Sequence, residues 1–283
     1  PAPAAQPEPA GPAAAPKAPA PLPSAYAPTA RSKPTVAPAP ASGPKFGGVM
    51  RVGHRGDPAY AWDTMRGTSY DLTSAAPSMY GDRSLVKNCR EDETQVCPGL
   101  ATSWESNSDF TEWTFTMRDG VKWHDGTPLT VQDAKFWVDL HFFGAKVGDK
   151  VRLGATSRST WGDLKKTEIL PGNKLKITLG RPATIYPTLI ASHYGIIMQH
   201  PKHLMEPRIK AGDVNVAPPD IGYVGTGPFK MKEYVKAVII SVRRNDNHWE
   251  KDTAGRQLPY LDGVDYYIIR DPSAFHAAFR SGR

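Results

Sequence analysis

The chain has 283 residues, with 35 basic and 28 acidic side chains, a formal net charge of +7 and 40% hydrophobic residues. This length and composition allow one large domain or two ordinary ones with a real core. Two cysteines exclude a disulfide-dense mini-scaffold and a four-cysteine zinc ribbon. No apolar run approaches the roughly 18 residues of a transmembrane helix. No run of five or six basic residues occurs either, so no nucleic-acid partner is predicted.

The N-terminal segment differs sharply from the rest, because 29 of the first 44 residues are Pro or Ala. It has almost no large apolar side chain, so burial cannot offset the entropy of ordering it. We expect residues 1–45 to form a disordered spacer biased towards polyproline II. A tether to a membrane is the leading interpretation, and an interdomain linker or a proline-rich protein ligand are the alternatives.

The folded region is predicted to start at Phe46 with a glycine-led strand over 47–53, followed by a turn-rich loop over 54–73. A hairpin leaves through 84–87 and returns through 95–96. Apolar residues alternate over 113–117, which predicts a half-buried strand that pairs with 121–123 through the turn at Asp119-Gly120. Further strands are expected in chain order as a strand–turn–strand over 163–179 and as strands over 229–232, 237–243 and 264–269.

Helix signals fall between these strands. Thr130 is a predicted N-cap with Asp133 three residues later, and this helix ends at Gly144. A short helix lies near Pro182 and Pro187 and ends near Tyr194, and a polar loop covers 212–223. Asp271-Pro272 opens a last helix. The fold class is therefore mixed α/β (α+β) with many hairpins rather than a regular β–α–β alternation.

Catalytic and metal signals are mostly absent, so no enzymatic activity, cofactor or metal is predicted. The glycines at 225 and 227 precede a strand, and Lys230 occupies the third glycine position of a dinucleotide-binding motif. His200 and His203 are close in sequence, but no nearby Cys or Asp completes a metal site. His124-Asp125 is better explained as part of a tight turn.

The two cysteines are the more informative pair. Cys89 and Cys97 enclose seven mostly polar residues between strand-like flanks. In an exported protein a cross-strand disulfide is the leading interpretation, with a stabilisation of about 2 kcal/mol for so short a loop. Two independent free thiols are the alternative.

Several long motifs, in order, carry a family resemblance. They are residues 98–105, 113–130 with Asp133 and Phe136, 225–229 with Glu233-Tyr234, 244–249, 259–264 and 268–272. This series resembles the extracellular solute-binding proteins of family 5, the peptide, dipeptide and nickel receptors of ABC importers. The match spans about residues 47–282.

The resemblance implies the first lobe of a type II periplasmic-binding-protein-like fold over 46–270, with a hairpin-rich subdomain over about 74–195. Residues 271–283 resemble the start of a second lobe, most of which is absent from this sequence. The implied function is non-covalent capture of a peptide-like or other small polar solute and its delivery to ABC permease subunits. The implied location is periplasmic or extracytoplasmic, with lipid anchoring through the N-terminal spacer.

The same resemblance implies the ligand-binding residues. The loop after the first strand offers His54, Arg55 and Asp57, and Tyr80 follows at the next landmark. Thr226 and Gly227 lie in a tight loop whose backbone N–H groups can hold a peptide or anion oxygen. The tryptophans at 104, 113, 123 and 137 are expected to pack in the core or at its rim.

A second hypothesis comes from another class of protein. The short chain can be a single-lobe paralogue that acts as a structural or interaction subunit of a larger assembly. An unpaired lobe leaves apolar surface bare unless a partner covers it. The retained cleft loops and the spacer favour the transport hypothesis instead.

Overall fold

Two four-stranded sheets form most of the fold. The structure is a computed structural model, and it describes residues 43–58, 63, 79, 85–89, 92–152, 154, 162–191 and 199–281. Contacts divide the chain into two units, Pro1–Gly43 and Pro44–Arg283, and the elements below belong to the second unit. The predicted spacer over 1–45 lies almost wholly outside the described residues. It therefore stays a prediction, as do the other domain bounds.

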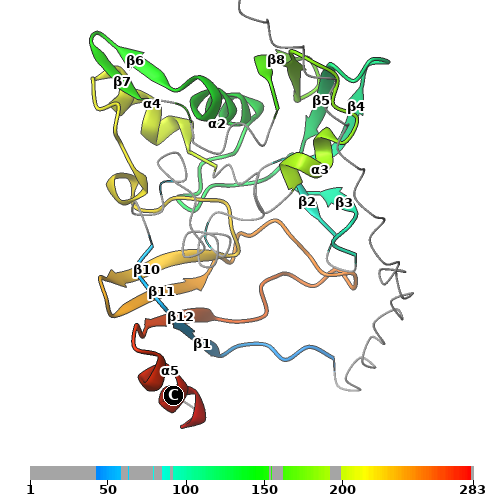
Figure 1. The fold of residues 1–283 in the computed structure, drawn as a ribbon. Helices are drawn as coiled ribbons and strands as arrows, with labels where there is room; N and C mark the ends of the chain where they lie inside the picture. The colour runs from blue at the N-terminus through cyan, green and yellow to red at the C-terminus, as the bar shows by residue number, and fades with distance from the viewer. Residues whose placement is uncertain are drawn as a thin grey trace, which may run out of the picture. The chain divides into compact units, whose positions relative to one another are not determined.

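The first sheet has the strand order β1-β12-β11-β10 (Figure 1). Its strands are β1 (Val49–His54), β10 (Phe229–Val235), β11 (Ile239–Arg244) and β12 (Gly263–Ile268). β1 pairs with β12 in parallel, from Val49 opposite Gly263 to His54 opposite Ile268, and the other neighbours are antiparallel. These strands lie close to the predicted ones, because alternating apolar residues and flanking turns mark each of them.

The second sheet is antiparallel, with the order β4-β5-β9-β8. Its strands are β4 (Ala101–Ser106), β5 (Glu112–Met117), β8 (Leu164–Leu170) and β9 (Lys174–Leu179). On β5 the side chains of Trp113, Phe115 and Met117 are buried and their neighbours are half-buried, which confirms the predicted alternation. The predicted strand–turn–strand over 163–179 is confirmed as β8 and β9.

The predicted pairing of residues 121–123 with β5 is wrong. β4 and β9 occupy both edges of β5, so no edge is left for a third partner. Residues 121–123 instead fold back on 127–129, where Trp123 N–H donates to the Thr127 carbonyl at 2.8 Å and Leu129 N–H donates to the Val121 carbonyl at 2.9 Å. The tight turn predicted at His124-Asp125 closes this narrow loop, where Gly126 N–H donates to the Trp123 carbonyl at 2.9 Å.

Helix α2 (Val131–Phe143) begins and ends where the sequence predicts. Thr130 N–H donates to the Asp133 carboxylate at 2.9 Å, which satisfies one of the free amides at the helix N-terminus. α5 (Pro272–Arg280) begins after Asp271, whose carboxylate accepts from Ala274 N–H at 2.7 Å. α3 (Tyr186–Ala191) matches the start of the short predicted helix, and its predicted end at Tyr194 lies outside the described residues.

The hairpin of β2 (Val86–Asn88) and β3 (Val96–Pro98) is also confirmed. Besides β4, the structure contains further elements that the sequence did not predict. They are β6 (Ala145–Val147), β7 (Lys150–Arg152), α4 (Lys202–Lys210) and the 3-10 turn η4 (Pro218–Ile221). η4 lies in the predicted polar loop, which is partly buried because Val214 and Val216 pack with α2 and α4.

The main core lies between the second sheet, α2 and α3. Trp113, Trp123 and Trp137 are buried in it and Trp104 packs at its margin, so the packing role predicted for them is confirmed. α5 lies against the first sheet at Gly53, where a Cβ atom would approach the Phe275 ring to 2.5 Å. Any larger residue at Gly53 would push the helix away from the strand.

Two buried histidines lie next to the core. The rings of His141 and His200 stack with centroids 5.1 Å apart, and neither residue is exposed to solvent. Burial lowers the pKa of each imidazole to about 3, and the positive charge of Arg152 adds to the effect. Both rings are therefore neutral near pH 7.

Replacing both histidines by phenylalanine, as His141→Phe/His200→Phe, should make stability less dependent on pH. The unfolded chain binds protons below pH 6.5 and the folded chain does not until about pH 3, so acidification through this window destabilises the protein. Each imidazole contributes up to about 1.4 kcal/mol per pH unit. Urea midpoints at pH 7 and pH 5 measure the change. The exposed His276→Phe is the control, and an unchanged slope in the double variant would contradict the prediction.

Candidate ligand-binding site

The Gly225–Gly227 loop before β10 is held by hydrogen bonds from several parts of the chain. Gly227 N–H donates to the Met79 carbonyl at 2.8 Å, and the Gly227 carbonyl accepts from Asn245 Nδ2 at 2.9 Å. The Gly225 carbonyl accepts from His124 N–H at 2.8 Å. These hydrogen bonds fix the loop before any ligand binds, and such preorganisation lowers the entropy cost of binding.

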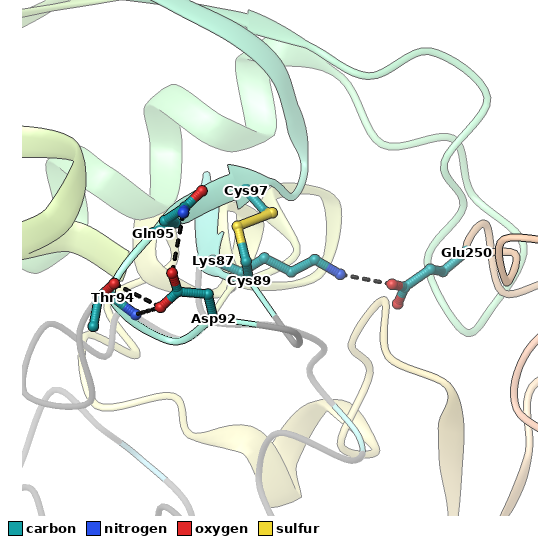
Figure 2. The surroundings of a disulfide bond; sticks show 7 residues. All are labelled: Lys87, Cys89, Asp92, Thr94, Gln95, Cys97 and Glu250. Atoms are coloured by element: carbon teal, nitrogen blue, oxygen red, sulfur yellow. Dashed lines mark hydrogen bonds and ion pairs between the residues drawn. A yellow bond between two sulfur atoms is a disulfide. The ribbon is translucent and has the colours of Figure 1, made fainter. Parts of the chain in front are cut away.

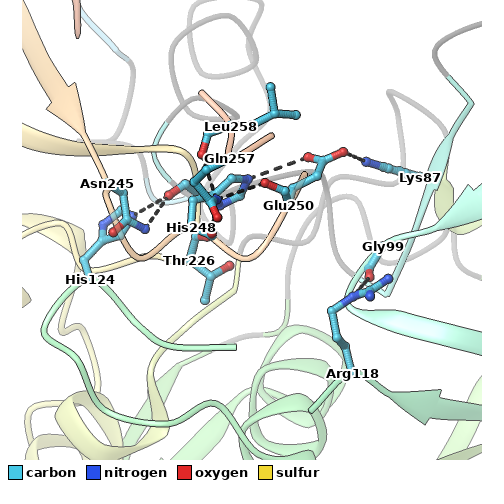
Figure 3. Close-up of polar contacts among 11 residues, drawn as sticks. Lys87, Gly99, Arg118, His124, Thr226, Asn245, His248, Glu250, Gln257 and Leu258 are labelled. Carbon is cyan, nitrogen blue, oxygen red and sulfur yellow. Dashed lines mark hydrogen bonds and ion pairs between the residues drawn. The ribbon is translucent and has the colours of Figure 1, made fainter. Parts of the chain in front are cut away.

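The His124 side chain completes this arrangement (Figure 3). Its Nδ1 accepts from Gly225 N–H at 3.2 Å, and its Nε2 donates to the Gly227 carbonyl at 3.1 Å. Only a neutral ring with its proton on Nε2 makes both contacts. Burial lowers the pKa of His124 to about 4, and the nearby Lys230 adds to the effect. His124 is therefore more than the turn residue that the sequence predicted.

Asp125 has the predicted turn role, because its carboxylate accepts from Thr127 N–H at 3.0 Å. It also lies 2.7 Å from His203 Nε2. His200 instead stacks on the buried His141. His200 and His203, which are close in sequence, therefore contact different residues. Among the residues that the structure describes, no group of three or more His, Cys, Asp or Glu side chains can hold a metal ion.

Thr226, a predicted ligand-binding residue, is 1% exposed. Its hydroxyl donates to Gln199 Oε1, and its carbonyl accepts from His248 Nδ1 at 3.3 Å. Thr226 and Gly227 thus share one network with His124, Asn245 and His248, and the last three were not predicted. Their sequence signal is that each lies within a family motif, while their meeting here depends on how the loops fold.

The loop after β1 carries the other predicted residues. His54 is buried, with Nδ1 2.6 Å from the Gly56 carbonyl and its ring edge-on to Tyr266. Arg55 is exposed, and its side chain pairs with none of the residues that the structure describes. Tyr80 lies outside the described residues.

Asp57 makes the most contacts in this loop. One carboxylate oxygen accepts from Tyr234 Oη at 2.9 Å and from Ala237 N–H at 2.7 Å, and the other lies 2.6 Å from Arg270 Nη2. Burial by itself raises the pKa of Asp57, but these hydrogen bonds and the Arg270 charge outweigh it and lower the pKa. The carboxylate joins β1 to the turn between β10 and β11 and to the segment that follows β12.

Asp57→Asn should therefore lower the free energy of unfolding by about 1–3 kcal/mol, as expected for a lost charged hydrogen bond. Because the folded pKa is lowered, this stabilisation is present above the ordinary carboxyl pKa and is lost as the pH falls through the folded value. Urea unfolding at pH 7 measures the loss. Asp246→Asn, at an exposed carboxylate, is the control, and equal stabilities for the two variants would contradict the structural role.

Sequence comparison places these features in a known family. The model of bacterial extracellular solute-binding proteins, family 5 Middle, matches residues 95–283, about two thirds of the chain. This chain belongs to family 5 of the bacterial extracellular solute-binding proteins. The disulfide is confirmed as well, because the structure joins Cys89 to Cys97.

Curated relatives agree with this family. A probable ABC transporter-binding protein of Deinococcus radiodurans is 29% identical over 200 residues, which are 65% of this chain and 32% of the relative. The dipeptide-binding protein of Escherichia coli is 27% identical over 224 residues, which are 75% of this chain and 38% of the relative. The chain thus spans about a third of the length of these family 5 relatives.

Solved structures confirm the expected fold class. The substrate-binding protein CtaP of Listeria monocytogenes superposes with a TM-score of 0.65 at 24% identity, over 84% of this chain and 44% of that one. The periplasmic binding protein DppA of Helicobacter pylori, in complex with the peptide STSA, superposes with a TM-score of 0.68 at 22% identity. The superposition covers 84% of this chain and 46% of DppA. The family 5 chain is a mixed α/β lobe that matches the N-terminal part of these structures.

Proposed function

We propose that this chain supplies the first lobe of an extracytoplasmic receptor that captures a peptide-like or other small polar solute and delivers it to the permease of an ABC importer. The family match over residues 95–283 carries this proposal. Capture is non-covalent, and closure of two lobes around the ligand is the transduction step, because only the closed form buries the ligand on both sides. No reaction is catalysed, so no general acid, base or cofactor takes part.

The relatives support a peptide-like solute without selecting one. The Escherichia coli relative is a dipeptide-binding protein, and the Helicobacter pylori structure holds a peptide. A related structure from Campylobacter jejuni is a complex with Ni(L-His). One scaffold thus accepts ligands of different chemistry, so the fold alone does not name the solute.

The same family and the composition of the N-terminal segment support the proposed location. We propose that the Pro/Ala-rich residues 1–45 tether the lobe to a lipid anchor at the membrane surface. The Cys89–Cys97 disulfide supports a compartment outside the cytoplasm, where such bonds persist. Within the described part of the chain, every helix is too short or too polar to span a bilayer.

Within the lobe, the proposed site residues are Arg55, His54 and Asp57 after β1 and Thr226 and Gly227 before β10. Tyr80 belongs to the same proposal and lies outside the described residues. Arg55 is the most accessible of those described, because it is exposed and its charge is unpaired among them. His54, Asp57 and Thr226 use their polar atoms within the protein. They therefore contribute by shaping the loops more than by donating charge to a solute.

Isothermal titration of the full-length protein that carries this chain tests the function. We expect saturable one-to-one binding within a panel of dipeptides, oligopeptides and Ni(L-His), with every peptide recovered intact by mass spectrometry. Arg55→Ala should weaken binding about tenfold, which corresponds to about 1.4 kcal/mol. Arg51→Ala, at an exposed residue of the same loop-bearing strand, is the matched control.

Two results would contradict this proposal. Absence of saturable binding across the whole panel would favour the alternative, a structural or interaction subunit. Cleavage of a peptide would overturn the non-catalytic mechanism. Binding that Arg55→Ala leaves unchanged would remove Arg55 from the site while the receptor function stands.

A further inference from the structure

The disulfide closes a very short hairpin (Figure 2). Its strands β2 and β3 have three residues each, and a two-stranded ribbon of this size is marginal by itself. The connecting turn is held by Asp92, which accepts from the Thr94 hydroxyl at 2.6 Å and from Gln95 Nε2 at 3.0 Å. Val86 is buried in the main core and Val96 packs against it, so the disulfide and this packing together hold the hairpin in place.

Lys87 extends from this hairpin to a distant part of the chain. It lies directly opposite Cys97 in the strand register and two residues before Cys89, so its backbone lies between the two ends of the disulfide. Its Nζ is 2.6 Å from Glu250 Oε1, and the two side chains are only 13% and 15% exposed. A charge pair this sheltered is costly to break from one side, because the remaining buried charge loses a close partner.

Glu250 continues the connection towards the candidate site (Figure 3). Its second carboxylate oxygen, Oε2, is 3.6 Å from Nε2 of the buried His248. His248 Nδ1 donates in turn to the Thr226 carbonyl at 3.3 Å. One carboxylate thus faces the hairpin lysine on one side and the histidine that holds the Gly225–Gly227 loop on the other.

The residue between His248 and Glu250 keeps this geometry in place. The Arg118 guanidinium lies 4.4 Å from the centre of the Trp249 ring, and Lys87 Nζ lies 5.8 Å from it. Arg118 is itself fixed, because its Nε donates to the Gly99 carbonyl at 3.1 Å. Trp249 also packs against the main core. The backbone on both sides of Trp249 therefore has little freedom to relax if the Glu250 contacts change.

We propose that Glu250 is a positioning residue that transmits the rigidity of the Cys89–Cys97 hairpin to the Gly225–Gly227 loop, through Lys87 and His248. The inference rests on the proposed function only in treating this loop as part of the ligand site. The effect of the disulfide thus extends beyond its own hairpin, because it limits the movement of the Gly225–Gly227 loop some 130 residues later in the chain.

Hydrogen exchange measured by mass spectrometry tests this coupling in the whole chain without any ligand. The peptide spanning 223–229 is followed in the wild type, Glu250→Gln, Cys89→Ala/Cys97→Ala and the triple variant. We expect each of the first two variants to raise exchange at the Gly225 and Gly227 amides roughly fivefold or more. The triple variant should exchange no faster than Glu250→Gln alone, because the hairpin acts through Glu250.

Matched controls separate this coupling from general destabilisation. Glu112→Gln breaks a different ion pair, to Lys176 at 3.3 Å, and should leave the loop unchanged. The β8–β9 turn over 171–173 should keep its wild-type exchange in every variant. Lys87→Met should raise exchange in the loop as Glu250→Gln does. Lys87→Arg retains the positive charge and should leave loop exchange at the wild-type rate. This second pair decides the question if Glu250→Gln does not fold.

Unchanged loop exchange in the cysteine variant would overturn the proposal. So would additive increases in the triple variant, because they would mean that hairpin and Glu250 act independently. Neither outcome depends on a ligand, so a failed titration would contradict the receptor function without affecting this result.

Discussion

The parallel pairing of β1 with β12 is the constraint on which the rest of the structure depends. Parallel neighbours cannot be joined by a tight turn, so the chain must leave the sheet and return in the same direction. Here the connection runs from residue 55 to residue 262 and contains the whole second sheet, α2 and the disulfide hairpin. The pairing also places the loop after β1 beside Tyr234 and Arg270, which Asp57 then joins.

A second level of organisation comes from imidazole side chains that connect separate loops. His124 accepts at one nitrogen and donates at the other, which joins the narrow loop after β5 to the segment before β10. His248 reaches the same segment from the other side through the Thr226 carbonyl. A loop held from both sides loses little conformational entropy when a ligand binds. This arrangement suits a family whose members bind ligands without chemical change.

Much of the fold was predictable because local signals were strong. The alternation of Trp113, Phe115 and Met117, the Thr130–Asp133 cap and the Asp271-Pro272 helix start each depend on a few neighbouring residues. Strand pairing was less predictable. β4 has only one buried apolar residue, Ala101, with Trp104 half-buried, so its pattern is weak, and without it residues 121–123 looked like the natural partner of β5. Pairing is decided by which strands compete for an edge, and that competition is not local.

The sequence by itself determined the family, the mixed α/β class, the cysteine pair and the loops that carry Asp57 and Thr226, because motifs and turns are written in adjacent residues. Only the tertiary structure decided which groups meet: Asp57 with Arg270, His124 with Gly225 and Gly227, and Lys87 with Glu250 across 163 residues. The physical reason is that hydrogen bonds and buried ion pairs act over a few ångströms, whereas their partners are distant in the chain. Those partners are brought together by the sheets and the core.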